Sequence, residues 1–313
     1  MRYFLKKLGA MIVTLFVISL LAFLAFQVIP GDPTSKLLGG EYTPERAAAL
    51  REALGLSGNV FLRYFKWLGA FVSGDFGTSY SYSMPVSELL DGKILTTALL
   101  SLLSFFMVVL FSIPAGFLAA RYGGGAFDRV MMVTNQLVMA IPPFFIGIVF
   151  TIVFGLSLNL FVAGRFVHIG EDFWEFWRCI VFPALSIALP KAAMTAKLLR
   201  SSILSELGSD YVRTAESRGS SRWQTLRRHV LRNAIIPVVT FLAVSIADIV
   251  AGSIIIEQVF SIPGLGRLLI SSISNRDFPV VQAIVVLISA IVVFVNFAAD
   301  IAYQCIDPRI RLR

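Results

Sequence analysis

The sequence has few charged residues and almost no cysteine. Only 15% of its 313 residues are charged and two are cysteines, whereas 57% are hydrophobic and the mean hydropathy is +0.81. A soluble domain carries roughly 25% charged and about 45–50% apolar residues, so a plain globular or disordered chain is excluded. Two cysteines also exclude a disulfide scaffold and a cysteine-rich metal site. The composition therefore predicts an integral membrane protein.

The sequence also lacks the common short motifs of enzymes. It has no GxxxxGK[ST] loop for phosphates, no HExxH and no GxSxG. The two histidines, His168 and His229, are predicted on opposite sides of the membrane and cannot form one site. We therefore expect no catalytic residue, no metal site and no cofactor in this chain. Any ATP hydrolysis that accompanies its function must take place on another polypeptide.

Six apolar stretches are long enough to cross a bilayer, which requires about 20 predominantly apolar residues per helix. The third contains Pro142-Pro143 and is too long for one straight span, so we expect it to be tilted and kinked there, or to extend past the bilayer. The first is longer than the apolar core of a signal peptide and should stay as an anchor. The predicted spans are 8–29, 95–120, 130–160, 179–196, 234–260 and 280–305.

Lysine and arginine are distributed unequally between the two sides of these spans. With a cytoplasmic N-terminus, the inner segments hold 16 Lys/Arg in 60 residues and the outer segments hold 10 in 102 residues. Cytoplasmic segments of membrane proteins are enriched in positive charge, so both termini are predicted to be cytoplasmic. The net charge of +8 is thus explained by topology and requires no nucleic-acid partner. The expected location is the plasma (inner) membrane of a prokaryote.

The outer segment 30–94 predicts a small platform. A Pro-Gly-Asp-Pro turn at 30–33 should end the first span, and Thr43 should cap a helix that starts at Pro44 and runs to Gly55. An aromatic stripe at helical spacing follows. It suits either an interfacial helix or packing against the outer ends of the bundle. The stripe consists of Phe61, Tyr64, Phe65, Leu68 and Phe71.

The inner segment 197–232 contains a short predicted helix. Ser209 should cap its start through the hydroxyl, Asp210 lies in its first turn, and Gly219 should end it in a left-handed conformation. Tyr211 and Ala215 fall on one side of this helix, with Val212 and Gly219 nearby, and Arg213, Glu216 and Arg218 flank it. Such a small-residue patch suits a groove in another protein. A solvated loop is the alternative.

This inner segment resembles the EAA loop of ABC-importer permeases, in the version of the dipeptide, oligopeptide and nickel branch. The resemblance rests on 210–219, on 228–234 and on Pro237, where Ala215 and Gly219 match the motif. Arg213, Thr214 and Arg232 depart from the general motif in a way that is similar to first-type permeases of that branch. Further similar stretches in the same order are 29–33, 75–79, Pro85-Val86, 199–202, 257–267, 276–280 and 307–309.

The resemblance implies the type I ABC importer permease fold, an all-α membrane protein with six transmembrane helices and a cytoplasmic coupling helix. It implies three regions: an N-terminal helix with the platform (1–94), the permease domain (95–303) and a cytoplasmic tail (304–313). The implied partners are a second homologous permease, two ATP-binding subunits that hold ATP and Mg, an extracytoplasmic solute-binding protein and membrane lipid. The implied contacts with the ATP-binding subunit are Asp210, Tyr211, Val212, Ala215, Glu216 and Gly219.

Two further sets of candidate residues lie in an outer loop and within the spans. The outer loop 261–279 is expected to meet the binding protein together with the platform, and glycines 264 and 266 should let it turn tightly. Its candidate contacts are Pro263, Gly264, Gly266, Arg267 and Asp277. Polar residues within the spans are candidates for the solute pathway, although helix-to-helix hydrogen bonding would also explain them. These residues are Asn135, Gln136, Asp248 and Glu257.

The solute is predicted to be a di- or oligopeptide. A nickel or metal-chelate importer of the same branch is the alternative, because both groups share the quoted motifs. A secondary transporter or channel is an alternative of another class, in which the intramembrane polar residues would be ion sites. Dependence of uptake on a separate ATPase distinguishes that class from an ABC importer.

Overall fold

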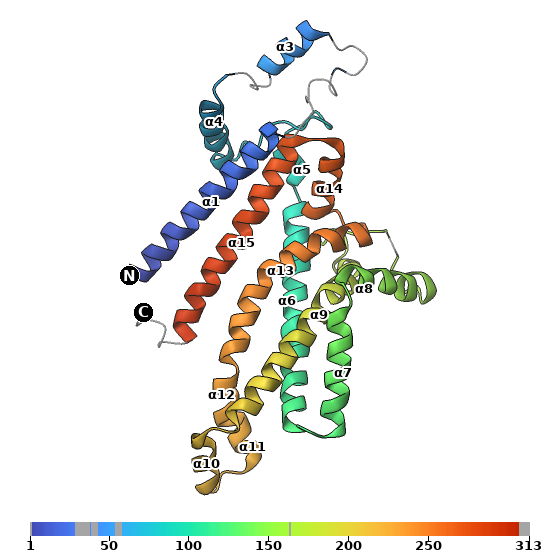
Figure 1. Ribbon diagram of the computed structural model, residues 1–313. Helices are drawn as coiled ribbons and strands as arrows, with labels where there is room; N and C mark the ends of the chain where they lie inside the picture. The colour runs from blue at the N-terminus through green and yellow to red at the C-terminus, as the bar shows by residue number, and fades with distance from the viewer. Residues whose placement is uncertain (1, 29–37, 39–42, 54–57, 163, 307–313) are drawn as a thin grey trace. The chain divides into compact units, whose positions relative to one another are not determined.

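A computed structural model describes residues 2–28, 38, 43–53, 58–162 and 164–306 (Figure 1). Within these ranges the chain is almost entirely helical, and its extended pairing is confined to an isolated bridge between Thr78 and Pro85. The predicted all-α membrane architecture is thereby confirmed. The turn at 30–33, the residues around Gly55 and the stretch 307–309 lie outside the described residues.

Five of the described helices are each long and apolar enough to cross a membrane. They correspond to the first, second, fourth, fifth and sixth predicted spans, and their ends differ from the prediction by several residues because the helices continue beyond the apolar cores. These helices are α1 (Arg2–Val28), α6 (Lys93–Arg121), α9 (Phe173–Glu206), α13 (Ile236–Phe260) and α15 (Phe278–Ile306).

The third predicted span is broken at the expected prolines. The helix α7 (Ala126–Ala140) ends before Pro142, and α8 (Pro143–Phe150), continued by the π-helix η2 (Thr151–Ser157), leaves at 96° to it. Pro142 is extended, with φ −61° and ψ 141°, because a residue that precedes proline is disfavoured in the helical region. The bend is much sharper than a tilt or an ordinary kink. The count of six spans therefore holds if this bent pair is one span.

Shorter helices occupy the connections. Thr43 caps the first of them as predicted, since its Oγ1 accepts a hydrogen bond from the Arg46 N–H at 3.3 Å. The shorter helices are α3 (Pro44–Ala53), α4 (Val60–Val72), α5 (Val86–Leu90), α10 (Asp210–Ser217), α11 (Arg222–Thr225), the π-helix η3 (Leu226–Val230), α12 (Leu231–Ala234) and α14 (Leu265–Asn275).

The chain forms two compact units, one made of 1–94 with 264–297 and one made of 95–263 with 298–313. In the second unit α9 contacts α7, α8, α12 and α13. It also passes close to α6 at Gly116, where an added Cβ would lie 2.6 Å from the carbonyl oxygen of Ala196 and 2.9 Å from the Cβ of Leu199. A glycine is needed there because it lets the two helix backbones approach closely.

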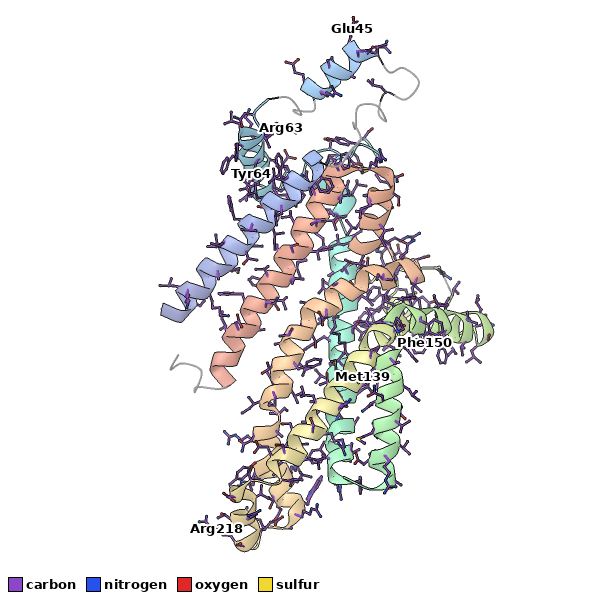
Figure 2. The ribbon with its side chains drawn as sticks, viewed as in Figure 1. Glu45, Arg63, Tyr64, Met139, Phe150 and Arg218 are labelled. Carbon is purple, nitrogen blue, oxygen red and sulfur yellow. The ribbon has the colours of Figure 1, made fainter. Side chains whose placement is uncertain are left out.

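In the first unit, α4 packs on α1 through one residue of the aromatic stripe. Tyr64 is 2% exposed, its hydroxyl is 2.8 Å from the Ser19 Oγ of α1, and its ring contacts Phe16 and Phe23 edge-on. Phe61, one turn before Tyr64, is 72% exposed, and the next residue of the stripe, Phe65, is 58% exposed. Tyr64 therefore packs against the chain itself, as the packing alternative predicts. The exposed aromatic residues of the stripe fit the alternative of an interfacial helix. Figure 2 shows Tyr64 and Arg63 on this helix.

Candidate functional site

The helix α10 begins and ends close to where the sequence predicts, after α9 in the chain, and lies beyond the end of α9 beside α11 (Figure 1). It ends in a Schellman motif: the Gly219 N–H bonds to the Glu216 carbonyl at 2.9 Å, and the Ser220 N–H bonds to the Ala215 carbonyl at 3.1 Å. Gly219 has φ +85°, so the predicted left-handed end is confirmed. At the start, Ser209 is the N-cap, but within the described chain its hydroxyl makes no capping bond, contrary to our expectation.

The side of α10 that was predicted to meet a partner is turned toward this chain. Val212 is 3% exposed and belongs to the hydrophobic core of the second unit, and Tyr211 packs against the same core. Ala215 is half-buried. In this conformation Val212 is therefore a core residue. The exposed surface of α10 is polar and consists of Asp210, Arg213, Thr214, Glu216, Ser217 and, beyond its end, Arg218.

Side-chain contacts attach the α10 segment to the ends of the long helices. The Tyr211 hydroxyl donates to Glu206 Oε2 at the end of α9, at 2.6 Å. Burial and this neighbouring carboxylate raise the pKa of Tyr211, so the hydroxyl stays a donor at neutral pH. Farther along, the Arg121 guanidinium at the end of α6 lies 4.5 Å from the centre of the Trp223 ring of α11. Arg218 projects at the far end of this segment (Figure 2).

An ion pair with a buried carboxylate joins α9 to the start of α7. The Arg200 guanidinium donates from Nη2 to Asp128 Oδ2 at 2.6 Å and from Nε to Oδ1. Asp128 also accepts the Gly124 N–H at 2.8 Å, which fixes the turn before α7. The pair is bidentate, a geometry that arginine forms readily with carboxylates. Arg200 belongs to a stretch that carried the family resemblance, but its partner could not be read from the sequence.

Asp277 was expected to contact a partner protein, and in the structure of this chain the residue is fully buried. Its carboxylate accepts three hydrogen bonds: from the Ser79 hydroxyl at 2.5 Å, the Tyr80 N–H at 3.0 Å and the Ser81 N–H at 3.2 Å. Burial of Tyr80, with the Asp277 charge beside it, raises the pKa of that phenol, and Arg63 opposes the shift. Asp277 therefore connects two stretches that the sequence motifs identified separately.

The predicted outer loop 261–279 is largely helical, since α14 occupies its middle. Gly264 is extended (φ −111°, ψ −173°) and Gly266 lies buried inside α14, so neither glycine makes the expected tight turn. The left-handed positions are Ser261 and Arg276, with φ 58° and 55°. Pro263 is half-buried. Of the five candidate contacts, Arg267 is the exposed one.

Two of the polar pathway candidates lie on α13, and one of them is buried whereas the other is exposed. Glu257 is fully buried on α13 and accepts a hydrogen bond from the Thr97 hydroxyl of α6 at 2.6 Å. Asp248 on the same helix is exposed and pairs with Lys191 of α9 at 2.5 Å. Glu257 thus joins two helices, as the hydrogen-bonding alternative expects, whereas Asp248 remains accessible from outside the unit.

The remaining two pathway candidates lie on α7. Gln136 accepts a hydrogen bond from Lys197 Nζ of α9 at 3.2 Å. The preceding residue, Asn135, is half-buried. The structure does not gather the predicted residues into a catalytic constellation. Within the described ranges no group of three or more His, Cys, Asp or Glu side chains is arranged to hold a metal ion.

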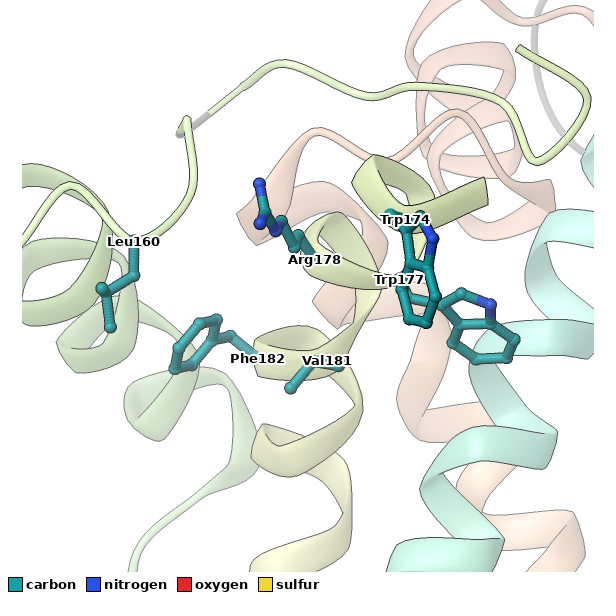
Figure 3. A pocket seen from close by; sticks show the side chains of 6 residues that line it. All are labelled: Leu160, Trp174, Trp177, Arg178, Val181 and Phe182. Atoms are coloured by element: carbon teal, nitrogen blue, oxygen red, sulfur yellow. The ribbon is translucent and has the colours of Figure 1, made fainter. Parts of the chain in front are cut away.

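A hollow on the second unit lies beside the first turns of α9. Figure 3 shows two tryptophans and Arg178 on α9, with Phe182 directed toward Leu160. Tryptophans at the end of an apolar span are typical of the membrane–water interface. The hollow is therefore consistent with contact with lipid. Its lining residues are Leu160, Trp174, Trp177, Arg178, Val181 and Phe182.

Comparison with known proteins gives matches along the whole chain. Residues 112–312 match the family described as "Binding-protein-dependent transport system inner membrane component", and residues 1–100 match the family of the corresponding N-terminal region. The chain is 32% identical to the "Probable peptide ABC transporter permease protein y4tP" of Sinorhizobium fredii over 309 residues, 99% of each chain. It is 35% identical to the "Glutathione transport system permease protein GsiC" of Salmonella choleraesuis over 313 residues, all of each chain.

One solved structure supports the fold. A chain from the MetNI methionine ABC transporter in inward-facing conformations superposes with a TM-score of 0.56 at 19% identity, covering 70% of this chain and 96% of that one. At this level of identity the likeness concerns the fold alone.

Proposed function

The chain belongs to the family of binding-protein-dependent transport system inner membrane components, and we propose that it forms half of the solute pathway of an ATP-driven peptide importer. It is a multi-pass inner-membrane permease subunit of an ABC importer. The observation that carries the peptide assignment is full-length identity of 32–35% to permeases that are named for peptide and glutathione transport. Glutathione is itself a small peptide, so both names indicate one class of solute.

Membership of this family implies that ATP-binding subunits and a solute-binding protein act together with the chain. In the arrangement we propose, two ATP-binding subunits hold ATP and Mg, and a second homologous permease completes the pathway. The chain has no phosphate-binding loop of its own, so hydrolysis takes place on those subunits. Both termini and α10 face the cytoplasm in this arrangement, as the excess of Lys and Arg in 197–232 favours.

We assign α10 as the element that docks on an ATP-binding subunit. Its exposed face carries Asp210, Arg213 and Glu216, and its buried face is joined to the chain's own core through Val212. A helix that is exposed on one side and anchored on the other can transmit a displacement without unfolding. Closure of the ATP-binding subunits would then move α10 and shift the permease between inward-facing and outward-facing states.

Reconstitution with the gene-neighbourhood partners tests this function. The purified complex in proteoliposomes should accumulate di- and tripeptides when the binding protein and ATP are present, and replacement of the phosphate-binding lysine of the ATP-binding subunits should abolish uptake. Accumulation of nickel or a metal chelate instead of peptides would overturn the solute assignment. Uptake that persists without ATP hydrolysis would show that the chain works as a secondary transporter or channel.

A further inference from the structure

The exposed residues of α13 beyond Pro237 form one stripe along the helix. They recur every three or four positions, so they lie on a single face. All three exposed polar residues of α13 belong to this stripe, with Asp248 at its centre, 12 residues or about 18 Å from each end of the helix at 1.5 Å per residue. We define the α13 stripe as Thr240, Val244, Asp248, Ala251, Ile255 and Gln258.

The centre of the α13 stripe is an exposed ion pair. Lys191 Nζ lies 2.5 Å from Asp248 Oδ2, and the two side chains are 26% and 57% exposed. Lys191 is also far from the ends of its own helix, since α9 extends 18 residues before it and 15 after it. Both charges therefore lie near the middle of long helices that are each apolar enough to cross a membrane. Charged side chains at this depth are rare and face a bundle interior or a water-filled cavity.

Another helix of the same unit shows what a lipid-compatible face looks like in this chain. The exposed face of α6 is apolar over the same depth, with Leu102, Phe106 and Leu110 one turn apart. The α13 stripe, in contrast, contains three polar side chains: the carboxylate of Asp248, the hydroxyl of Thr240 and the amide of Gln258. The contrast indicates that α6 and α13 face different surroundings.

We infer that the α13 stripe lines a water-containing solute pathway and that the Lys191–Asp248 pair contacts the passing solute and sets its charge preference. This inference rests on the proposed function, because a pathway requires a transported solute. A peptide carries an ammonium and a carboxylate, which can exchange with the carboxylate and ammonium of the pair. Because the pair has no net charge, it rejects neither sign, and a solute with both charges fits it.

Thiol labelling tests the location of the stripe without any assumption about the solute. In a complex whose permease carries Cys179→Ser and Cys305→Ser, single cysteines replace Val244 and Ala251, which flank Asp248 on the stripe, or Phe106 on α6 as the control. Membrane-impermeant methanethiosulfonate reagents should modify both stripe cysteines at least about tenfold faster than the control. Labelling of the stripe at the rate of the α6 control would overturn the inference.

Charge variants test the role of the pair in transport. Lys191→Gln leaves an unpaired carboxylate and should favour cationic over anionic peptides, whereas Asp248→Asn leaves an unpaired ammonium and should have the opposite effect. A unit charge on the peptide about 6 Å from the unpaired charge of a single variant changes transport relative to a neutral peptide by roughly threefold in water and by roughly a hundredfold at an effective dielectric constant of 20. The double variant should lack the charge preference of the single variants and transport neutral peptides at a rate between the single variants and the wild type.

The pair Asp128–Arg200 is the matched control, because it also joins two helices of the same unit but its carboxylate is only 2% exposed, compared with 57% for Asp248. Asp128→Asn should lower the amount of assembled complex and reduce transport of all peptides equally. Equal loss of cationic and anionic peptides in the Lys191 and Asp248 variants would show that their pair is only structural. If the wild-type complex transports no peptide, the proposed function fails, while the labelling result still decides whether the stripe faces water.

Discussion

Replacement of Asp277 should destabilise the first unit strongly, because the carboxylate is fully buried and is the shared acceptor for three donors of residues 79–81. Asp277→Ala removes all three hydrogen bonds. Asp277→Asn retains one acceptor oxygen but loses the charge. The alanine variant is therefore expected to have the larger effect on the free energy of unfolding.

The expected loss in the free energy of unfolding depends on how exposed the three hydrogen-bond donors are. Hydrogen bonds to a charged group contribute about 1.5–3 kcal/mol each. The Ser79 hydroxyl is buried and would lose its full contribution, whereas Ser81 is exposed and its N–H can bind water instead. We expect Asp277→Ala to cost about 3–5 kcal/mol in total and Asp277→Asn roughly half as much.

The assay is thermal unfolding of the purified permease in detergent, followed by tryptophan fluorescence. At about 2 °C per kcal/mol, Asp277→Ala should lower the melting temperature by roughly 6–10 °C. Asp75→Ala is the matched control: its exposed carboxylate accepts one backbone N–H, from Gly77, and the change should cost about 1 kcal/mol or less. A melting temperature for Asp277→Ala within 2 °C of that control would refute the role assigned to Asp277.

The remaining predictions concern glycines and the α10 helix. Gly116→Ala should reduce thermal stability and complex yield, by about 2 kcal/mol or more, because its Cβ would overlap α9, whereas Gly69→Ala meets no atom within 4 Å and should be neutral or stabilising. Gly219→Val should uncouple ATP hydrolysis from uptake through backbone strain of about 1 kcal/mol or more, with Gly219→Asn as the milder change. Ala215→Trp should disturb the packing of α10 and lower coupled transport. Arg213→Glu, on the exposed face, should reduce retention of the ATP-binding subunit without changing the melting temperature of the permease.

Long apolar runs were the part of the fold that the sequence predicted best. Each run of about 20 apolar residues has one stable arrangement in a bilayer, so the existence of the spans follows from composition alone. The break at Pro142-Pro143 was also readable, because proline removes a donor and restricts its neighbour. The 96° angle was not, since it depends on what packs against both halves.

The helix α14 was missed although the sequence contains a signal for it. Leu265, Leu268, Leu269 and Ser272, at helical spacing, lie on its half-buried to buried side, but the two glycines at 264 and 266 favoured a loop. The contacts of Asp277 could not be found in this way, because its partners lie 196–198 residues earlier in the chain. Long-range pairs of this kind leave no local pattern.

The same limit applies to the predicted functional sites. Helical spacing correctly placed Tyr211 and Ala215 on one side of α10, yet it could not tell whether that side faces a partner or the chain itself. The structure shows that Val212, the residue between them, is buried in the chain's own core, whereas Ala215 is half-buried. Asp248 was identified from its charge within a span, but the pairing with Lys191 required the two helices to be placed side by side.

The polar contacts of α9 explain how a movement of α10 could reach the middle of the membrane. One continuous helix carries Lys191, Arg200 and Glu206, which contact α13, α7 and α10 respectively. On the other side of α10 the chain returns to α13 through the π-helix η3, whose hydrogen-bond ladder is less regular than that of an α-helix. A displacement of α10 should therefore be transmitted mainly through α9, as a rigid element, to the Lys191–Asp248 pair, while η3 absorbs the change in the connection to α13.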